Sequence, residues 1–87
     1  MQAFDFQYQC NMLRLKRLTA KEVCKLLHNV GFLVHHTHGS HINLRHSEKK
    51  HLRVVVPYHN RILAPKTLKS IIMQAELSKE EIRNFFN

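Results

Sequence analysis

The hydrophobic pattern of this chain begins with a stripe that has the 3.6-residue period of an α-helix. It is formed by Val23, Leu26, Leu27 and Val30, which follow the i, i+3, i+4, i+7 spacing of one helix face. Thr19 and Glu22 have the S/T-x-x-E spacing of a capping box, which gives acceptors to the free N–H groups at a helix start. Gly31 is suited to the left-handed conformation that ends many helices. The pattern therefore predicts a helix from Ala20 to Val30.

After this helix the hydrophobic period shortens to two, which is the period of half-buried β-strands. Three successive segments have this period: Phe32–Thr37, His41–His46 and His51–Val56. Gly39 and Ser40 separate the first two segments by a tight turn, because glycine adopts the positive φ that such a turn needs. Pro57 is expected to end the third strand, because proline has no N–H to donate to a sheet.

A second helical stripe follows, and it is formed by Leu68, Ile71, Ile72 and Ala75. Pro65 suits the first turn of that helix, and Ser78 with Glu81 forms another capping box before a short last helix. The order is helix, three strands, helix, with a short helix appended, which is an α+β fold. Two hairpins give a three-stranded antiparallel sheet. Both main helices are expected on one face of it, which leaves the other face open.

Residues 1–17 are the least regular part of the chain and are interpreted as an N-terminal extension of a domain that spans residues 18–87. Apolar and polar residues alternate from Phe4 to Cys10, as they do in a strand. Two interpretations stay open for this extension. It is an added edge strand or partner-binding arm, or it is a stretch that is partly non-native or disordered.

Charge and composition limit the class of partner. The chain has 87 residues, enough for one small domain, and its 14 Lys and Arg against 6 acidic residues give a net charge of +8. Such an excess indicates a polyanionic partner: RNA, DNA, an acidic protein or an anionic membrane. Two cysteines without a CxxC motif favour a reducing compartment. No apolar run approaches a membrane span and no signal peptide is evident, so we expect a cytoplasmic protein without a membrane partner.

The candidate chemistry lies in the strand that follows the glycine turn. If the apolar residues of this strand face a core, His41, Asn43 and Arg45 share the opposite face. Imidazole can take or give a proton near neutral pH, and guanidinium binds phosphate, so these side chains suit work on a phosphate. Arg45 is about 13 Å from His41 along the strand, so it cannot share one phosphate with His41 but could bind another on the same RNA.

Four stretches of the sequence, in this order, carry a family resemblance: Thr19–Val23 with Leu26-Leu27 and Gly31-Phe32, then Gly39-Ser40-His41, then Val56–His59, then Pro65–Ala75. From Leu18 onward the chain resembles the HicA toxin family, small prokaryotic ribonucleases of toxin–antitoxin pairs. The resemblance implies a double-stranded-RNA-binding-domain-like α-β-β-β-α fold. It also implies cleavage of mRNA with His41 as the essential residue, and a HicB-type antitoxin as the protein partner.

The resemblance makes His41 the candidate catalytic residue of a metal-independent endoribonuclease, with no cofactor expected. Cleavage by the ribose 2′-hydroxyl needs a base, an acid and positive charge near the phosphate, and a positioned acid or base contributes about 10²- to 10⁴-fold in rate. His38, across the turn, or His59, after the third strand, is a candidate for the second proton-transfer group, and the alternative that substrate and water suffice stays open. The candidate RNA contacts are Ser40, Asn43, Arg45, Lys49, Lys50 and Arg53.

A metal centre is not expected, although four histidines are close together in the sequence between positions 35 and 41. Neighbouring residues of a regular strand point to opposite faces, so His35 and His36 should not join one site.

Two alternative functions stay open. A non-catalytic RNA-binding module would share the fold, the charge and the open face, and it would retain RNA without cleaving it. A protein-interaction subunit would use its basic face only to dock an acidic partner, and its binding would be insensitive to competing RNA.

Overall fold

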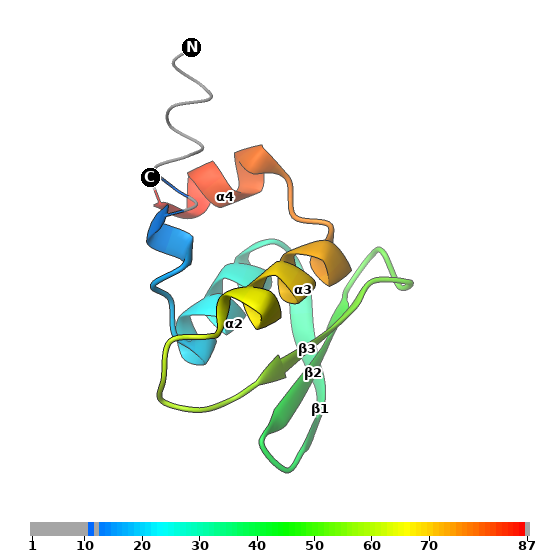
Figure 1. The fold of residues 1–87 in the computed structure, drawn as a ribbon. Helices are drawn as coiled ribbons and strands as arrows, with labels where there is room; N and C mark the ends of the chain where they lie inside the picture. Colours follow the sequence, from blue (N-terminus) through cyan, green and yellow to red (C-terminus); the bar gives the residue numbers. More distant parts are fainter. Residues whose placement is uncertain (1–10, 12, 87) are drawn as a thin grey trace.

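The computed structural model describes residue 11 and residues 13–86 (Figure 1). The elements are, in chain order, helix α2 (Ala20–Asn29), strands β1 (Phe32–His38), β2 (His41–His46) and β3 (Arg53–Pro57), and helices α3 (Pro65–Ala75) and α4 (Lys79–Phe86). The predicted order of helix, three strands, helix and a short appended helix is confirmed. The alternating stretch from Phe4 to Cys10 lies outside the described residues.

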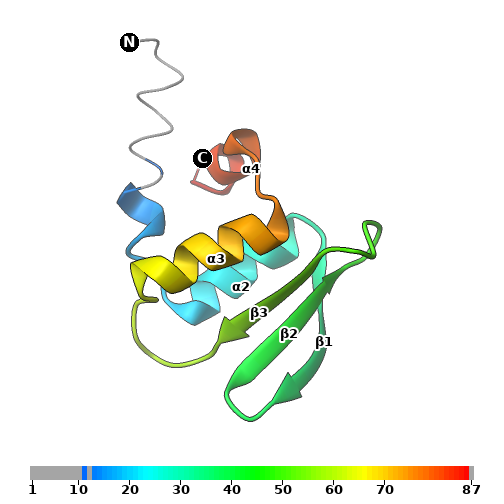
Figure 2. The ribbon, with the colours of Figure 1, turned by 45° about the vertical axis from the view of Figure 1, so that its right-hand side comes forward.

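The three strands form one antiparallel sheet in the order β1-β2-β3, so β2 is paired on both sides. Helices α2 and α3 cover one face of this sheet, as both ribbon views show (Figures 1 and 2). None of the described helices packs on the opposite face. The predicted layers are confirmed, and they leave one sheet face accessible to a partner.

Helix α2 begins at the capping box that the sequence predicts. The Glu22 N–H donates to Oγ1 of Thr19 at 3.4 Å, and the Thr19 N–H donates to Oε1 of Glu22 at 3.1 Å. Two backbone donors at the helix start therefore have acceptors. The helix ends at Asn29 with Val30 as its C-cap, one residue before the predicted end. Gly31 follows with φ +109°, a conformation that strains any residue with a Cβ.

Helices α3 and α4 also begin at residues that favour a helix start. Pro65 occupies the first turn of α3, and Glu76 ends that helix in the left-handed region with φ 51°. Ser78 and Glu81 form the second capping box, in which the Glu81 N–H donates to the Ser78 hydroxyl oxygen at 3.0 Å. None of the described helices is long and apolar enough to span a lipid bilayer.

The core lies between the helices and the sheet, and all six elements contribute to it. Its buried apolar residues are Leu15, Leu18, Ala20, Val23, Leu26, Leu27, Phe32, Leu44, Leu52, Val54, Val56, Leu63, Leu68, Ile71, Ala75 and Ile82. The apolar residues at 52, 54 and 56 are all buried whereas Arg53 and Val55 are exposed, which is the alternation that the period of two predicts for the third strand. Leu15 is fully buried, so residues before α2 belong to the same core.

Strand β3 begins later than predicted. It starts at Arg53 rather than at His51, because the preceding residues close the turn from β2. The Leu52 N–H donates to the Lys49 carbonyl at 2.9 Å inside this turn, so the backbone there is folded back rather than extended.

Strand β3 also ends later than predicted, because it includes Pro57, which pairs with His41. The Val55 N–H points away from β2 and donates to Oε1 of Gln74 at 3.2 Å. The strand period of two gives the Pro57 nitrogen the same outward direction. Pro57 therefore removes no hydrogen bond from the β2–β3 ladder, so the strand includes this residue and then ends, one residue beyond the predicted end at Val56.

Strand β1 carries a β-bulge that the sequence analysis did not predict. Val34 pairs with Leu44 and His36 pairs with Asn43, so His35 is an extra residue without a partner on β2. The bulge interrupts the alternation of faces, and the rings of His35 and His36 lie in edge-to-face contact with their centroids 5.2 Å apart. The expectation that these two histidines point to opposite faces is therefore wrong.

Candidate functional site

The open face of the sheet carries three rows of side chains that run across the strands. The rows are His38, His41 and Pro57 beside the turn; His36, Asn43 and Val55 in the middle; and Leu33, Arg45 and Arg53 at the far end. No residue of the three strands is acidic. The guanidinium groups of Arg45 and Arg53 therefore give this face a positive potential, which attracts anions.

A two-residue turn positions the first row. Gly39 has φ +60° and Ser40 does not have a positive φ, which is the pattern of a type II′ hairpin turn. No other residue lies within 4 Å of the place where a Cβ on Gly39 would stand, so glycine is needed for its conformation rather than for space. The Tyr58 N–H donates to the Ser40 carbonyl at 2.6 Å, which ties the turn to the end of β3.

His41 begins β2 and is exposed on the open face, where it lies between His38 and Pro57. Directly opposed residues of an antiparallel pair have Cβ atoms about 4.5–5.5 Å apart, so the His38 and His41 side chains are neighbours. His38 is exposed as well. A phosphodiester that approaches this face can therefore contact both imidazole rings.

His59, the other candidate for the second proton-transfer group, is placed differently. It lies in the loop after β3, two residues beyond Pro57, and its Nδ1 accepts a hydrogen bond from the Arg61 N–H at 3.2 Å. This bond holds the ring against its own loop. Of the two candidates, only His38 is paired with His41 across the strands.

The predicted RNA contacts Asn43, Arg45 and Arg53 share the open face with His41. Asn43 is about 6.7 Å from His41 along β2, and Arg45 is about 13 Å from it. Arg45 lies directly opposite Arg53, and like charges in opposed positions destabilise a sheet. Within the described part of the chain neither arginine has an ion-pair partner, and Nε of Arg45 is buried without a hydrogen-bond partner.

The predicted lysines lie in the exposed turn between β2 and β3. Lys50 lines a hollow of about 270 Å³ together with His35 and Arg45, so it extends the basic end of the sheet. Lys49 is exposed and does not line this hollow.

His35 and His36 were not predicted as site residues. Together with Asn43, Arg45 and Arg53 they line a small hollow of about 130 Å³ on the open face. The Arg45 guanidinium is the main cause that holds the pKa of His35 below its ordinary value, followed by desolvation and by the charges of His36 and Arg53. No glycine or proline within β1 marks the bulge in the sequence. Among residues 11 and 13–86, no group of three or more His, Cys, Asp or Glu side chains is placed to hold a metal ion.

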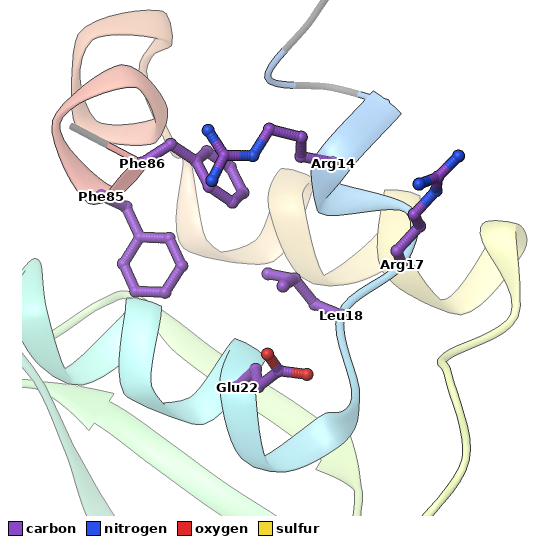
Figure 3. Close-up of a pocket in the computed structure, with 6 residues that line it drawn as sticks. All are labelled: Arg14, Arg17, Leu18, Glu22, Phe85 and Phe86. Atoms are coloured by element: carbon purple, nitrogen blue, oxygen red, sulfur yellow. The ribbon is translucent and has the colours of Figure 1, made fainter.

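A larger hollow of about 470 Å³ lies elsewhere in the molecule (Figure 3). It is lined by Arg14, Arg17, Leu18, Glu22, Phe85 and Phe86. The Arg14 guanidinium carbon is 4.5 Å from the centre of the Phe86 ring, so this side chain already has a cation–π partner. Both ribbon views place α4 at the end of the molecule away from the hairpin turn (Figures 1 and 2). The lining residues include no imidazole, and Glu22 is engaged in a helix cap, so the open sheet face is the better candidate site.

A comparison with known protein families identifies the chain. The family model that describes the HicA toxins of bacterial toxin–antitoxin pairs matches residues 20–77, about two thirds of the 87 residues. This protein belongs to the HicA toxin family. As a HicA protein it is the toxin of a toxin–antitoxin system, and its partner is an antitoxin. Among curated proteins, no significant match to the chain is found.

The HicA match runs from the start of α2 to two residues beyond α3. It therefore includes the glycine turn, all three rows of the open sheet face and His59. Helix α4 and the residues before α2 lie outside the match, so the large hollow of Figure 3 is built mostly from residues that the HicA family model does not cover.

Proposed function

We propose that this HicA toxin is a metal-independent endoribonuclease that cleaves mRNA, with His41 as its essential proton-transfer residue. The observation that carries the proposal is the position of His41 on a basic sheet face without a helix, directly opposite His38 and beside a turn that needs Gly39. We further propose that a HicB-type antitoxin is its inhibitor. Because mRNA is the proposed substrate, the protein is expected to act in the cytoplasm.

In this mechanism the RNA supplies the nucleophile. One imidazole takes the proton of a ribose 2′-hydroxyl, and the oxygen attacks the adjacent phosphorus. The bond between phosphorus and the 5′-oxygen breaks, and a second, protonated imidazole gives its proton to that oxygen. The products are a 2′,3′-cyclic phosphate and a 5′-hydroxyl. His41 and His38 are the two groups that suit these steps, because their side chains are neighbours on one face.

The other polar residues of the face are proposed to bind RNA rather than to transfer protons. Asn43 donates hydrogen bonds from its amide next to His41, and Ser40 offers a hydroxyl at the turn. Arg45, about 13 Å along β2, binds a phosphate other than the one that is cleaved. Lys49, Lys50 and Arg53 extend this basic surface. Affinity for RNA should therefore fall steeply as salt is added.

Single-turnover cleavage of a labelled RNA in the presence of EDTA tests the proposal. We expect the wild type to cleave the RNA and His41→Ala to cleave it about 10²- to 10⁴-fold more slowly, with unchanged thermal unfolding. His28→Ala is the matched control, because His28 is an exposed histidine on α2, and this variant should cleave at the wild-type rate. A folded His41→Ala protein that cleaves at the wild-type rate would reject the assignment. Retention of RNA without cleavage by the wild type would identify a non-catalytic RNA-binding module instead.

The same assay assigns the second proton-transfer group. His38→Ala should lower the rate by about 10²- to 10⁴-fold, because it removes the imidazole opposite His41. His59→Ala should stay close to the wild-type rate, because the His59 ring is held by its own loop. The reverse result, an active His38→Ala and an inactive His59→Ala, would assign the second proton transfer to His59.

The proposed antitoxin inhibits by covering the open face. Leu33 and Val55 on this face and Tyr58 beside it are exposed apolar side chains, and the net charge of the chain is +8. An acidic protein with a few apolar contacts would complement such a surface. Addition of a HicB-type antitoxin should abolish both RNA cleavage and RNA binding. An antitoxin that binds without changing either would have to bind elsewhere.

A further inference from the structure

The bulge in β1 brings together nitrogen donors that a regular strand would separate. Because His35 is inserted without a partner on β2, its ring meets that of His36, with centroids 5.2 Å apart and an interplanar angle of 70°. Both rings line the small hollow with Arg45 and Arg53. The side chains that line this hollow therefore come from all three strands, and each of these four carries a positive charge or can acquire one.

This cluster has no anion to balance it within the described part of the chain. Arg45 and Arg53 are directly opposed, and neither has a carboxylate partner there. Nε of Arg45 is buried, and no described group accepts a hydrogen bond from it. A buried donor without an acceptor and a pair of opposed like charges both destabilise the folded state. Destabilising features of this kind are found mainly at functional sites, where a ligand supplies the missing hydrogen-bond acceptor or opposite charge.

We propose that His35, His36, Arg45 and Arg53 form a phosphate-binding subsite, which holds a backbone phosphate of the RNA other than the one that is cleaved. The guanidinium groups donate hydrogen bonds in a planar fork that matches phosphate oxygens, and the imidazoles add further donors. The hollow of about 130 Å³ is far smaller than the pockets of about 300–1,000 Å³ that enclose whole small molecules. It therefore suits a single phosphate group.

The position of the subsite relative to His41 indicates the path of the RNA over the sheet, which runs along β2. An RNA strand that runs along β2 from the turn meets His41 first, then the middle row with Asn43, and then the subsite about 13 Å from His41. The middle row also contains His36, so polar donors continue from the turn to the subsite without a break. This continuity favours a nucleic acid backbone, which presents a phosphate at every nucleotide. The identity of this ligand rests on the proposed ribonuclease function.

RNA binding in a non-cleaving background tests the subsite. The full chain with His41→Ala is titrated into a fluorescently labelled single-stranded RNA in EDTA, and anisotropy is measured between about 50 and 200 mM salt. We expect Arg45→Gln and Arg53→Gln to weaken binding about tenfold or more, and the double change His35→Gln with His36→Gln to do the same. Each arginine replacement should also reduce the slope of log K against log salt by about 0.7, the loss of one phosphate contact.

The matched control is Lys25→Gln, which removes the same charge from an exposed position on α2 and should keep both affinity and slope. Arg53 is exposed, so its replacement tests the subsite without disturbing the core. Folded Arg45→Gln and Arg53→Gln proteins that keep the parent affinity and slope would overturn the subsite. Loss of antitoxin binding with unchanged RNA binding would overturn it as well, and it would make the cluster a protein-docking surface.

Because imidazoles bind protons near neutral pH, their contact with phosphate should make the affinity for RNA depend on pH, which a purely structural role of these residues would not do. His35 faces His36, Arg45 and Arg53 in the small hollow, and the adjoining hollow brings it near Arg45, His46 and Lys50. The arginines disfavour a protonated ring, whereas a bound phosphate favours it. RNA binding should therefore take up protons and strengthen as the pH falls through the imidazole range. The double histidine variant should show a weaker pH dependence than its His41→Ala parent, which keeps His38 on the open face, and an equal dependence in the two proteins would count against the subsite.

Inorganic phosphate separates a failure of the subsite from a failure of the nuclease. Its titration should saturably shift the imidazole NMR signals of His35 and His36 and leave those of His28 in place, whereas equal shifts at all three would overturn the subsite. If phosphate and the RNA variants behave as expected but the wild type does not cleave RNA, the subsite stands and the ribonuclease proposal is wrong. If cleavage depends on His41 but the subsite variants bind as the parent does, only the subsite is wrong.

Discussion

Gly31→Ala probes the junction between α2 and the sheet. Gly31 has φ +109°, and a Cβ there would lie 2.6 Å from Nε2 of His46. The His46 ring cannot simply move away, because Nε2 donates to the Val30 carbonyl at 2.9 Å. Its Nδ1 accepts hydrogen bonds from two backbone N–H groups of the β2–β3 turn, at 3.1 and 3.0 Å. An alanine at this position therefore has two costs, backbone strain and displacement of the ring.

The magnitude follows from these two terms. A left-handed backbone costs a residue with a Cβ about 1–2 kcal/mol. Loss of the hydrogen bond between His46 and Val30 costs about 0.5–1.5 kcal/mol. The free energy of unfolding should therefore fall by about 1.5–3.5 kcal/mol, which for a domain of this size lowers Tm by about 6–28 °C.

Urea unfolding followed by circular dichroism measures this loss, with Gly39→Ala as the internal reference. Gly39 also has a positive φ, but no other residue lies within 4 Å of a Cβ built there, so this variant bears only the backbone strain. Gly31→Ala should cost about 0.5–1.5 kcal/mol more than Gly39→Ala, and this excess should vanish in a His46→Ala background. A loss no larger than that of Gly39→Ala, or an excess that persists without the His46 ring, would show that the His46 ring does not oppose a Cβ at position 31.

Three further predictions concern stability. Arg53→Gln should raise the free energy of unfolding by about 0.2–1 kcal/mol at low salt, because it removes a like charge opposite Arg45; denaturant unfolding that gives a lower value would contradict this. The pKa of His35 is lowered in the folded state, so the unfolded chain binds the proton more readily, and stability should fall as the pH drops below the ordinary imidazole range. Unfolding experiments at a series of pH values measure this effect. The free energy of unfolding of His35→Gln should fall less with decreasing pH than that of the wild type, and equal slopes for the two proteins would contradict the prediction. Thr19→Ala removes the side-chain cap of α2 and should cost about 1 kcal/mol, measured by thermal and urea unfolding; an unchanged midpoint would mean that the cap is not formed in solution.

The helices were predictable because their signals are local. Each capping box involves residues three positions apart, so Thr19 with Glu22 and Ser78 with Glu81 could be identified in the sequence and are formed in the structure. The exposure of His41 was predictable for a similar reason. It follows a glycine turn and alternates with the apolar residues of β2, and the buried Leu44 fixes which face of that strand points to the core.

The features that were not predicted depend on contacts between distant segments. The bulge at His35 arises from the pairing of β1 with β2, and no residue within β1 marks it. Pro57 is tolerated in β3 because its nitrogen faces away from β2, in the same direction as the Val55 N–H, which donates to Gln74 on α3. The bulge brings the rings of His35 and His36 together in one hollow with Arg45 and Arg53, whereas a regular strand would point them to opposite faces.

The role of His41 is decided by the single-turnover rate of RNA cleavage by His41→Ala, relative to the wild type in EDTA. We expect a rate lower by about 10²- to 10⁴-fold in a protein with wild-type thermal unfolding. Equal rates for the two proteins would contradict it.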